Sequence, residues 1–172
     1  MEKLTKEQMT NSVKEFTLPT YLEIPDVGLY LEQVVKFVSG YLEPLPNVTI
    51  TNSMISNYVK KGIIANPVKK LYNREQIAYI IFIAIAKSVL TLEDLQLMIN
   101  LQKSTYESKI AYEYFCNEFV SILKYVFGLG EEPKEISKKN SDEKTLLRNT
   151  AIAIAHKVYL DKFTEFLRES IK

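Results

Sequence analysis

The 172-residue sequence is poor in cysteine, glycine, proline and histidine, and it contains no tryptophan. The single cysteine, Cys116, excludes an internal disulfide framework, which fits a reducing, cytoplasmic setting. Five glycines and six prolines are few for a turn-rich β fold, so long helices are favoured. The apolar fraction of 47% is ordinary for a globular protein and is enough to form a core.

Long apolar runs are also scarce. The longest apolar-rich run, Ile77 to Ala86, has ten residues, whereas a membrane-spanning helix needs about 20. The N-terminal stretch MEKLTKEQMTNSVKEF has no apolar core of signal-peptide length. We therefore expect a cytoplasmic protein with no membrane partner.

The sequence holds few of the residues that catalysis or metal binding requires. His156 is the only histidine, and a lone histidine on a helix is more often a packed or surface residue than a base. Cys116 lies in an amphipathic pattern and is expected to pack as a small apolar group. The GLG stretch at 128–130 is not followed by the Lys-Ser/Thr pair of a phosphate-binding loop. We therefore predict no enzyme activity, no cofactor and no metal site.

Apolar spacing and capping residues predict an all-α fold. Thr51 and Asn73 are expected to cap the starts of two helices, and Gly62 is expected to end the first of them. The helix over 74–89 is apolar on nearly every side, so it must be buried either by this chain or by a partner. No segment shows the period-two alternation of a strand. The expected helices span residues 4–16, 27–42, 52–61, 74–89, 92–103, 104–127 and 141–171.

Positive charge is concentrated in one segment of this nearly neutral chain, whose net charge is +1. A solvated loop and helix face would also explain such a cluster. However, clustered charge is the electrostatic footprint of nucleic-acid-binding proteins, and here it coincides with a short helix. Residues 51–76 contain one acidic residue, Glu75, and five basic residues, Lys60, Lys61, Lys69, Lys70 and Arg74.

The helix over 52–61 has the features of a helix that reads DNA. Such a helix fits a major groove about 12 Å wide, presents small polar side chains to base edges, and has Lys or Arg nearby for phosphates. We predict that Asn52 and Asn57 pair with adenine edges and that Ser53 and Ser56 contact several bases. The alternative is that these side chains only solvate the helix. The residues predicted to contact phosphates are Lys60, Lys61, Lys69, Lys70 and Arg74.

One stretch, MISNYVKKGII…VKKLYNREQIAYIIFIAIAKSVLTLEDLQLMI from Met54 to Ile99, resembles the N-terminal region of MerR-type regulators. In that family a recognition helix ends in a Lys/Arg-Lys-Gly-Leu pattern, and a wing then leads to a capped helix. Ser56 stands where an arginine commonly contacts DNA, and the wing is shortened to ANPVKK without a glycine-turn hairpin. The matching residues are Lys61, Gly62, Tyr72, Asn73, Thr91 and Leu92.

A longer part of the chain, from about Leu18 to about Phe115, resembles a bacterial family catalogued as domain of unknown function 1836. The resemblance rests on LPTYLEIPDVGLYLEQVVKFV and TNSMISNYVKKGIIANPVKKLYNREQIAYI. That family carries no established activity. The resemblance therefore implies a helical fold with a MerR-like centre and leaves the function open.

We therefore expect an all-α protein with a MerR-like helix-turn-helix domain, a shortened wing and long C-terminal helices. Residues 1–17 would form an N-terminal helical arm, residues 18–103 the DNA-binding-like domain, and residues 104–172 a helical extension. The extension would pack on the domain, form a dimer or serve as an effector region. A polar, charged linker is expected within it, over residues 128–144.

The predicted function is a DNA-binding transcriptional regulator that binds double-stranded DNA as a homodimer, because two-fold pairing doubles the site and the phosphate contacts. The helix over 74–89 and the last helix are the candidate dimer interfaces. One alternative is a helical adaptor that binds another protein and not DNA. A second is a sensor whose small-molecule effector, still unknown, binds a pocket lined by Tyr112, Phe115 and Phe119.

Overall fold

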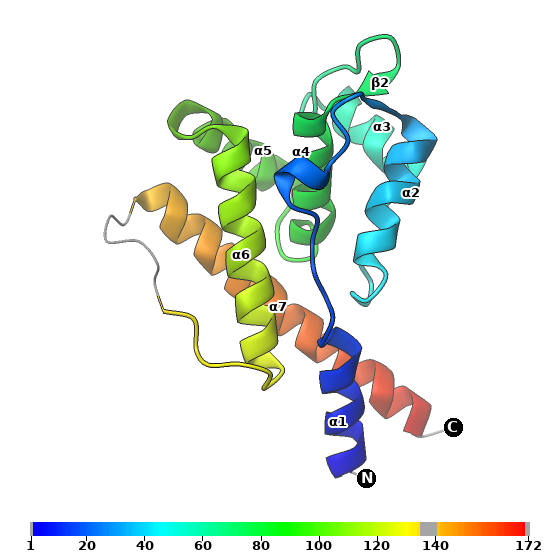
Figure 1. The fold of residues 1–172 in the computed structure, drawn as a ribbon, viewed down its shortest axis with the longest axis vertical. Helices are drawn as coiled ribbons and strands as arrows, with labels where there is room; N and C mark the ends of the chain where they lie inside the picture. The colour runs from blue at the N-terminus through cyan, green and yellow to red at the C-terminus, as the bar shows by residue number, and fades with distance from the viewer. Residues whose placement is uncertain (1, 135–140, 171–172) are drawn as a thin grey trace.

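The computed structural model describes residues 2–134 and 141–170, with side chains described from Lys6 onward (Figure 1). The described chain is mostly helical, so the predicted helical class is confirmed. The helices are α1 (Glu2–Val13), α2 (Leu31–Leu42), α3 (Asn52–Lys60), α4 (Arg74–Ala86), α5 (Leu92–Thr105), α6 (Ser108–Val126) and α7 (Asp142–Ser170), with a 3₁₀ turn at Tyr21–Glu23.

Helix α4 lies at the centre of the fold, and this chain alone buries it. It contacts α2, α5, α6 and α7, and every residue from Ile80 to Ala86 is buried. The prediction that helix 74–89 offers a dimer interface is therefore wrong. Its apolar sides are already covered by four helices of the same chain.

Helices α6 and α7 pack side by side and close the core against α4 (Figure 1). One continuous hydrophobic cluster joins Phe16 after α1, Ile80 in α4, Phe119 in α6 and Ile154 in α7. Helices α6 and α7 therefore pack on the helices of residues 18–103. The helix expected from residue 104 begins later, at Ser108, because α5 continues to Thr105. Part of the expected linker, residues 135–140, lies outside the described residues.

A short antiparallel ladder interrupts the helical pattern. It pairs β1 (Leu29–Tyr30) with β2 (Leu71–Tyr72), so that Leu29 faces Tyr72 and Tyr30 faces Leu71. No period-two pattern in the sequence indicated these strands, because two residues are too few to show one. The helix expected from residue 27 begins only at Leu31, because Leu29 and Tyr30 belong to β1. Gly28 directly precedes the ladder and has a φ of +83°.

Two helix starts follow the predicted local chemistry. The Thr51 hydroxyl accepts a hydrogen bond from the Met54 amide at 3.2 Å, which caps α3. At α4, Asn73 Oδ1 accepts from the Gln76 amide at 2.9 Å, while Gln76 Oε1 accepts from the Asn73 amide at 2.8 Å. Both predicted caps are therefore confirmed, and at α4 Gln76 closes a capping box with Asn73.

No helix among the described residues combines the length and the apolar character that a membrane crossing requires.

Candidate nucleic-acid interface

Helix α3 is short, is held at both ends and buries one face. Ile55 and Tyr58 point into the core and are buried. At its C-terminus, the Gly62 amide donates to the Val59 carbonyl at 2.9 Å and the Ile63 amide to the Tyr58 carbonyl at 3.0 Å. These are the two bonds of a Schellman motif, which needs the left-handed φ of +73° that Gly62 supplies. The predicted helix end is therefore confirmed.

The predicted base-contacting residues lie mainly on the solvent side of α3. Asn52, Ser53 and Ser56 are exposed, and Asn57 is half-buried. Ser53 Oγ also lies 3.3 Å from the Thr51 hydroxyl, within hydrogen-bond distance. Lys60 is exposed at the last turn. The outer face of α3 is therefore polar and accessible, with small side chains along it and Lys60 at its last turn.

The segment after α3 forms a tight hairpin. The Val68 amide donates to the Leu71 carbonyl at 3.2 Å, and the Leu71 amide donates back to the Val68 carbonyl at 2.9 Å. Lys69 and Lys70 occupy the two central positions with φ of +51° and +65°, as a type I′ turn requires. The shortened wing lacks a glycine-turn hairpin, as expected, but it still forms a hairpin, because two lysines adopt the conformation that glycine or asparagine usually supplies.

The base of the hairpin is attached to α4. Gln76 Nε2 donates to the Ala65 carbonyl at 2.9 Å and to the Asn66 carbonyl at 3.4 Å, while the same side chain closes the capping box with Asn73. One buried glutamine therefore fixes the wing relative to α4. We call Ala65–Tyr72 the wing from here on.

The wing and α3 meet at one surface recess. Asn52, from the first turn of α3, and Lys70, from the wing tip, both line it. The start of α2 completes it, because the pairing of β1 with β2 brings Tyr30 beside the wing. The other lining residues are Leu31, Glu32, Gln33, Pro67 and Tyr72. Sequence reasoning missed Tyr30 and Gln33, since the only signal for their position is a two-residue strand pairing.

Arg74 lies apart from this group. Its Nε donates to the Ile24 carbonyl at 2.7 Å and its Nη2 to the Leu22 carbonyl at 3.4 Å, and its guanidinium lies 5.7 Å from the centre of the Tyr21 ring. Asp26 is 3.8 Å away. The arginine predicted to contact phosphate therefore holds the extended segment before α2 against α4.

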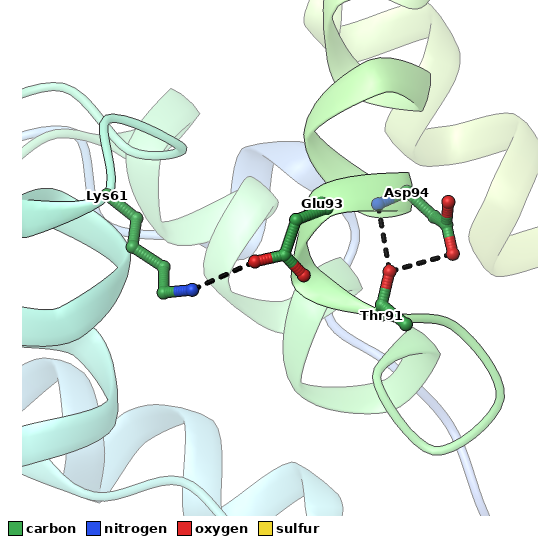
Figure 2. Close-up of polar contacts among 4 residues, drawn as sticks. All are labelled: Lys61, Thr91, Glu93 and Asp94. Atoms are coloured by element: carbon green, nitrogen blue, oxygen red, sulfur yellow. Dashed lines mark hydrogen bonds and ion pairs between the residues drawn. The ribbon is translucent and has the colours of Figure 1, made fainter.

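Lys61 is exposed but paired within the chain (Figure 2). Its Nζ lies 3.0 Å from Glu93 Oε1, in the first turn of α5. Thr91 caps the same turn, because its hydroxyl accepts from the Asp94 amide at 3.1 Å. The hydrogen bond from Lys61 lowers the pKa of Glu93, because it favours the ionised carboxylate. Glu93, like Tyr30 and Gln33, is a residue that sequence reasoning did not place at this surface.

The described residues contain no cluster of three or more His, Cys, Asp or Glu side chains arranged to hold a metal ion.

Comparison with known proteins identifies a family but no closer relative. No curated protein and no solved structure matches the chain. The family described as a domain of unknown function (DUF1836) matches residues 19–119, which is more than half of the sequence and agrees with the predicted span. This chain is a member of that family.

Proposed function

We propose that this protein binds double-stranded DNA through α3 and the wing, as a transcriptional regulator with a MerR-like helix-turn-helix. The observation that carries the proposal is the wing tip. Two adjacent lysines stand there in left-handed backbone conformations, beside the polar first turn of α3.

The backbone at the wing tip is costly for these residues. A side chain with a Cβ in the left-handed region costs about 1 kcal/mol or more. Glycine or asparagine would relieve that cost at Lys69 and Lys70. Backbone strain of this kind is concentrated at binding and switch sites. The presence of two lysines at the tip, despite this cost, is best explained by a contact between their positive charges and a negatively charged partner.

The chemistry of the surface suits a nucleic acid. Asn52 and Ser56 would offer amide and hydroxyl groups to base edges, while Lys60 and Lys70 would neutralise phosphates on either side. We leave Arg74 out of this surface because its guanidinium already contacts main-chain carbonyls. Lys61 would become available to phosphate when its ion pair with Glu93 breaks.

We also propose that the protein acts as a homodimer through α7. Leu160, Phe163 and Leu167 are exposed and recur at helical spacing, so they form one apolar stripe on its C-terminal half. Two-fold pairing would present two α3 helices to one DNA duplex, which doubles the number of phosphate contacts. With α4 buried inside the chain, α7 is the remaining candidate of the two interfaces expected from the sequence.

The test is fluorescence anisotropy of a mixed-sequence duplex titrated with protein at about 50 and about 200 mM salt. Two variants each lose four positive charges. One carries Lys60→Ala, Lys61→Ala, Lys69→Ala and Lys70→Ala. The matched control carries Lys6→Ala, Lys14→Ala, Lys109→Ala and Lys134→Ala, four exposed lysines outside α3 and the wing.

We expect micromolar binding that weakens steeply with salt, because bound lysines release counterions from the phosphates. Binding should be lost in the first variant and kept in the control. Equal loss in both variants would indicate nonspecific attraction. No binding by folded wild-type protein at low salt would overturn the proposal and favour a protein-binding adaptor.

A further inference from the structure

A cavity of about 80 Å³ lies between α4, α5, α6 and α7, away from α3 and the wing. Its walls are apolar. Ala78 and Phe82 come from α4, Met98 and Ile99 from α5, and Phe115 from α6. Protein interiors are normally packed as densely as organic crystals, so a space of this size among large side chains is unusual.

The lining differs in part from the effector pocket expected from the sequence. Tyr112 and Phe115 line the cavity as expected, but Phe119 does not. Phe119 is instead packed between Phe16 and Phe115, with ring centres 5.9 and 5.7 Å away. The cavity therefore lies nearer the N-terminus of α6 than the sequence indicated.

The apolar walls continue to the protein surface. Leu101 in α5, Ile110 in α6 and Leu146 in α7 line the same space, and all three are among the exposed large hydrophobic residues. Three helices thus contribute one exposed apolar residue each around a single opening. This rim is an entry path for an apolar molecule, whereas a closed packing defect would have none.

The polar and charged groups in the lining already have partners within the chain. The Glu143 carboxylate accepts a hydrogen bond from the Thr105 hydroxyl at 3.1 Å. Lys144 Nζ lies 5.7 Å from the centre of the Tyr106 ring and 5.8 Å from that of Tyr114.

The Tyr79 hydroxyl donates to Gln102 Oε1 at 2.7 Å and lies 3.0 Å from Ser108 Oγ. Gln102 Nε2 donates to the Tyr106 carbonyl at 2.6 Å. A charged ligand would lose its hydration in this cavity and would find no uncommitted polar group to replace it. Burying a charge in this way costs free energy. The site therefore selects against charge.

The size of the cavity limits the ligand further. An apolar cavity of about 150 Å³ stays dry and holds benzene. The present space is smaller, but it opens onto the rim of Leu101, Ile110 and Leu146, so part of a ligand can extend outward. We propose that the space enclosed by α4, α5, α6 and α7 is a binding site for a small uncharged apolar molecule, about the size of one substituted aromatic ring.

The test uses methyl NMR spectra of the full chain titrated with toluene, benzoate and benzylamine. These three probes share one ring and differ in charge. Toluene should cause saturable shifts of the Met98 and Ile99 methyl groups and raise the melting temperature. Benzoate and benzylamine should bind at least ten-fold more weakly. Because this titration contains no DNA, its result tests the ligand site independently of the proposed DNA binding.

Cavity-filling variants provide the specificity control. Ala111→Leu adds volume within the lining, and Ala78→Val is a smaller second filler should the first fail to fold. Ala153→Leu makes the same kind of change at an exposed position on α7 outside the lining. Toluene affinity should fall at least ten-fold in a folded filler variant and stay unchanged in Ala153→Leu.

Any one of four results would overturn the proposal. The first is no saturable shift with toluene up to its solubility limit in the folded wild type. The second is equal affinity for the charged probes, and the third is unchanged toluene affinity in a folded filler. Cavity methyl shifts that instead follow protein concentration would assign the opening to a second copy of the chain, which also contradicts a small-molecule site.

Discussion

Lys61 at the end of α3 donates to Glu93 in the first turn of α5, with Nζ and Oε1 3.0 Å apart (Figure 2). Both side chains are exposed, so the pair adds little to stability and exchanges readily with solvent. The pair matters for the proposed DNA surface, because Lys61 is one of the four lysines of that surface and its ammonium group is bound to Glu93. If the proposed surface binds DNA, the Glu93 carboxylate would compete with phosphate for Lys61.

Glu93→Gln should therefore strengthen DNA binding. The change frees Lys61, so we expect affinity to rise by a few-fold and the slope of log affinity against log salt to steepen by about 0.9, as one added phosphate contact predicts. Fluorescence anisotropy at several salt concentrations measures both quantities. Glu165→Gln, at an exposed position of α7, makes the same charge change elsewhere and should have little effect. Equal gains in the two variants would show a general charge effect and no role for the Lys61–Glu93 pair.

The wing tip allows stability and binding to be changed in opposite directions. Lys69→Asn with Lys70→Gly introduces the residues that a type I′ turn favours, so the free energy of unfolding should rise by about 1–2 kcal/mol. The same change removes two charges from the proposed surface and should weaken DNA binding at least ten-fold. Urea denaturation and anisotropy check the two effects. A more stable protein with unchanged DNA affinity would show that these lysines are only solvated.

A buried ion pair joins α6 to α7. Arg148 Nη1 lies 2.5 Å from Glu118 Oε2, and Nη2 donates to the Pro133 carbonyl at 2.6 Å. Glu118 is only 1% exposed. Arg148→Met should lower the free energy of unfolding by about 3 kcal/mol, because it leaves a buried carboxylate without its partner. Urea denaturation should show that adding Glu118→Leu restores most of the loss. If the double variant is no more stable than Arg148→Met, the unpaired Glu118 carboxylate is not the cause of the lost stability.

Alkaline pH should destabilise the fold through buried groups of α6. Burial raises the pKa of Cys116 from 9.0 to about 12, and burial also raises the pKa of Tyr112. The unfolded chain therefore loses these protons before the folded chain does. The stabilisation is complete below about pH 9 and is lost as pH rises toward 12. Unfolding free energies measured across this range should fall less steeply in Cys116→Ala. An identical slope in that variant would assign the alkaline loss to other groups.

The proposed dimer depends on the stripe of α7. Leu160→Glu with Leu167→Glu places two charges among exposed apolar side chains, so self-association should weaken while the buried core stays unchanged. Sedimentation velocity across a protein concentration series measures the effect. A wild-type protein that stays monomeric at all concentrations would exclude this interface, without bearing on DNA binding by one protomer.

The local features of the site were predictable from the sequence. Thr51, Gly62 and Asn73 act within three to five residues of their own positions, since a cap or a helix end depends on hydrogen bonds to nearby main chain. The polar outer face of α3 follows equally from helical spacing. These signals need no knowledge of the rest of the fold.

Only the tertiary structure decided how distant segments combine. The pairing of Leu29 with Tyr72 brings the start of α2 to the wing, and the Val68–Leu71 bridge forces Lys69 and Lys70 into left-handed conformations. Composition indicated a basic cluster, yet it could not show which members were already bound to other parts of the chain. Helix spacing and caps are set by neighbours along the sequence, whereas partners such as Glu93 for Lys61, and the Leu22 and Ile24 carbonyls for Arg74, depend on which surfaces pack together.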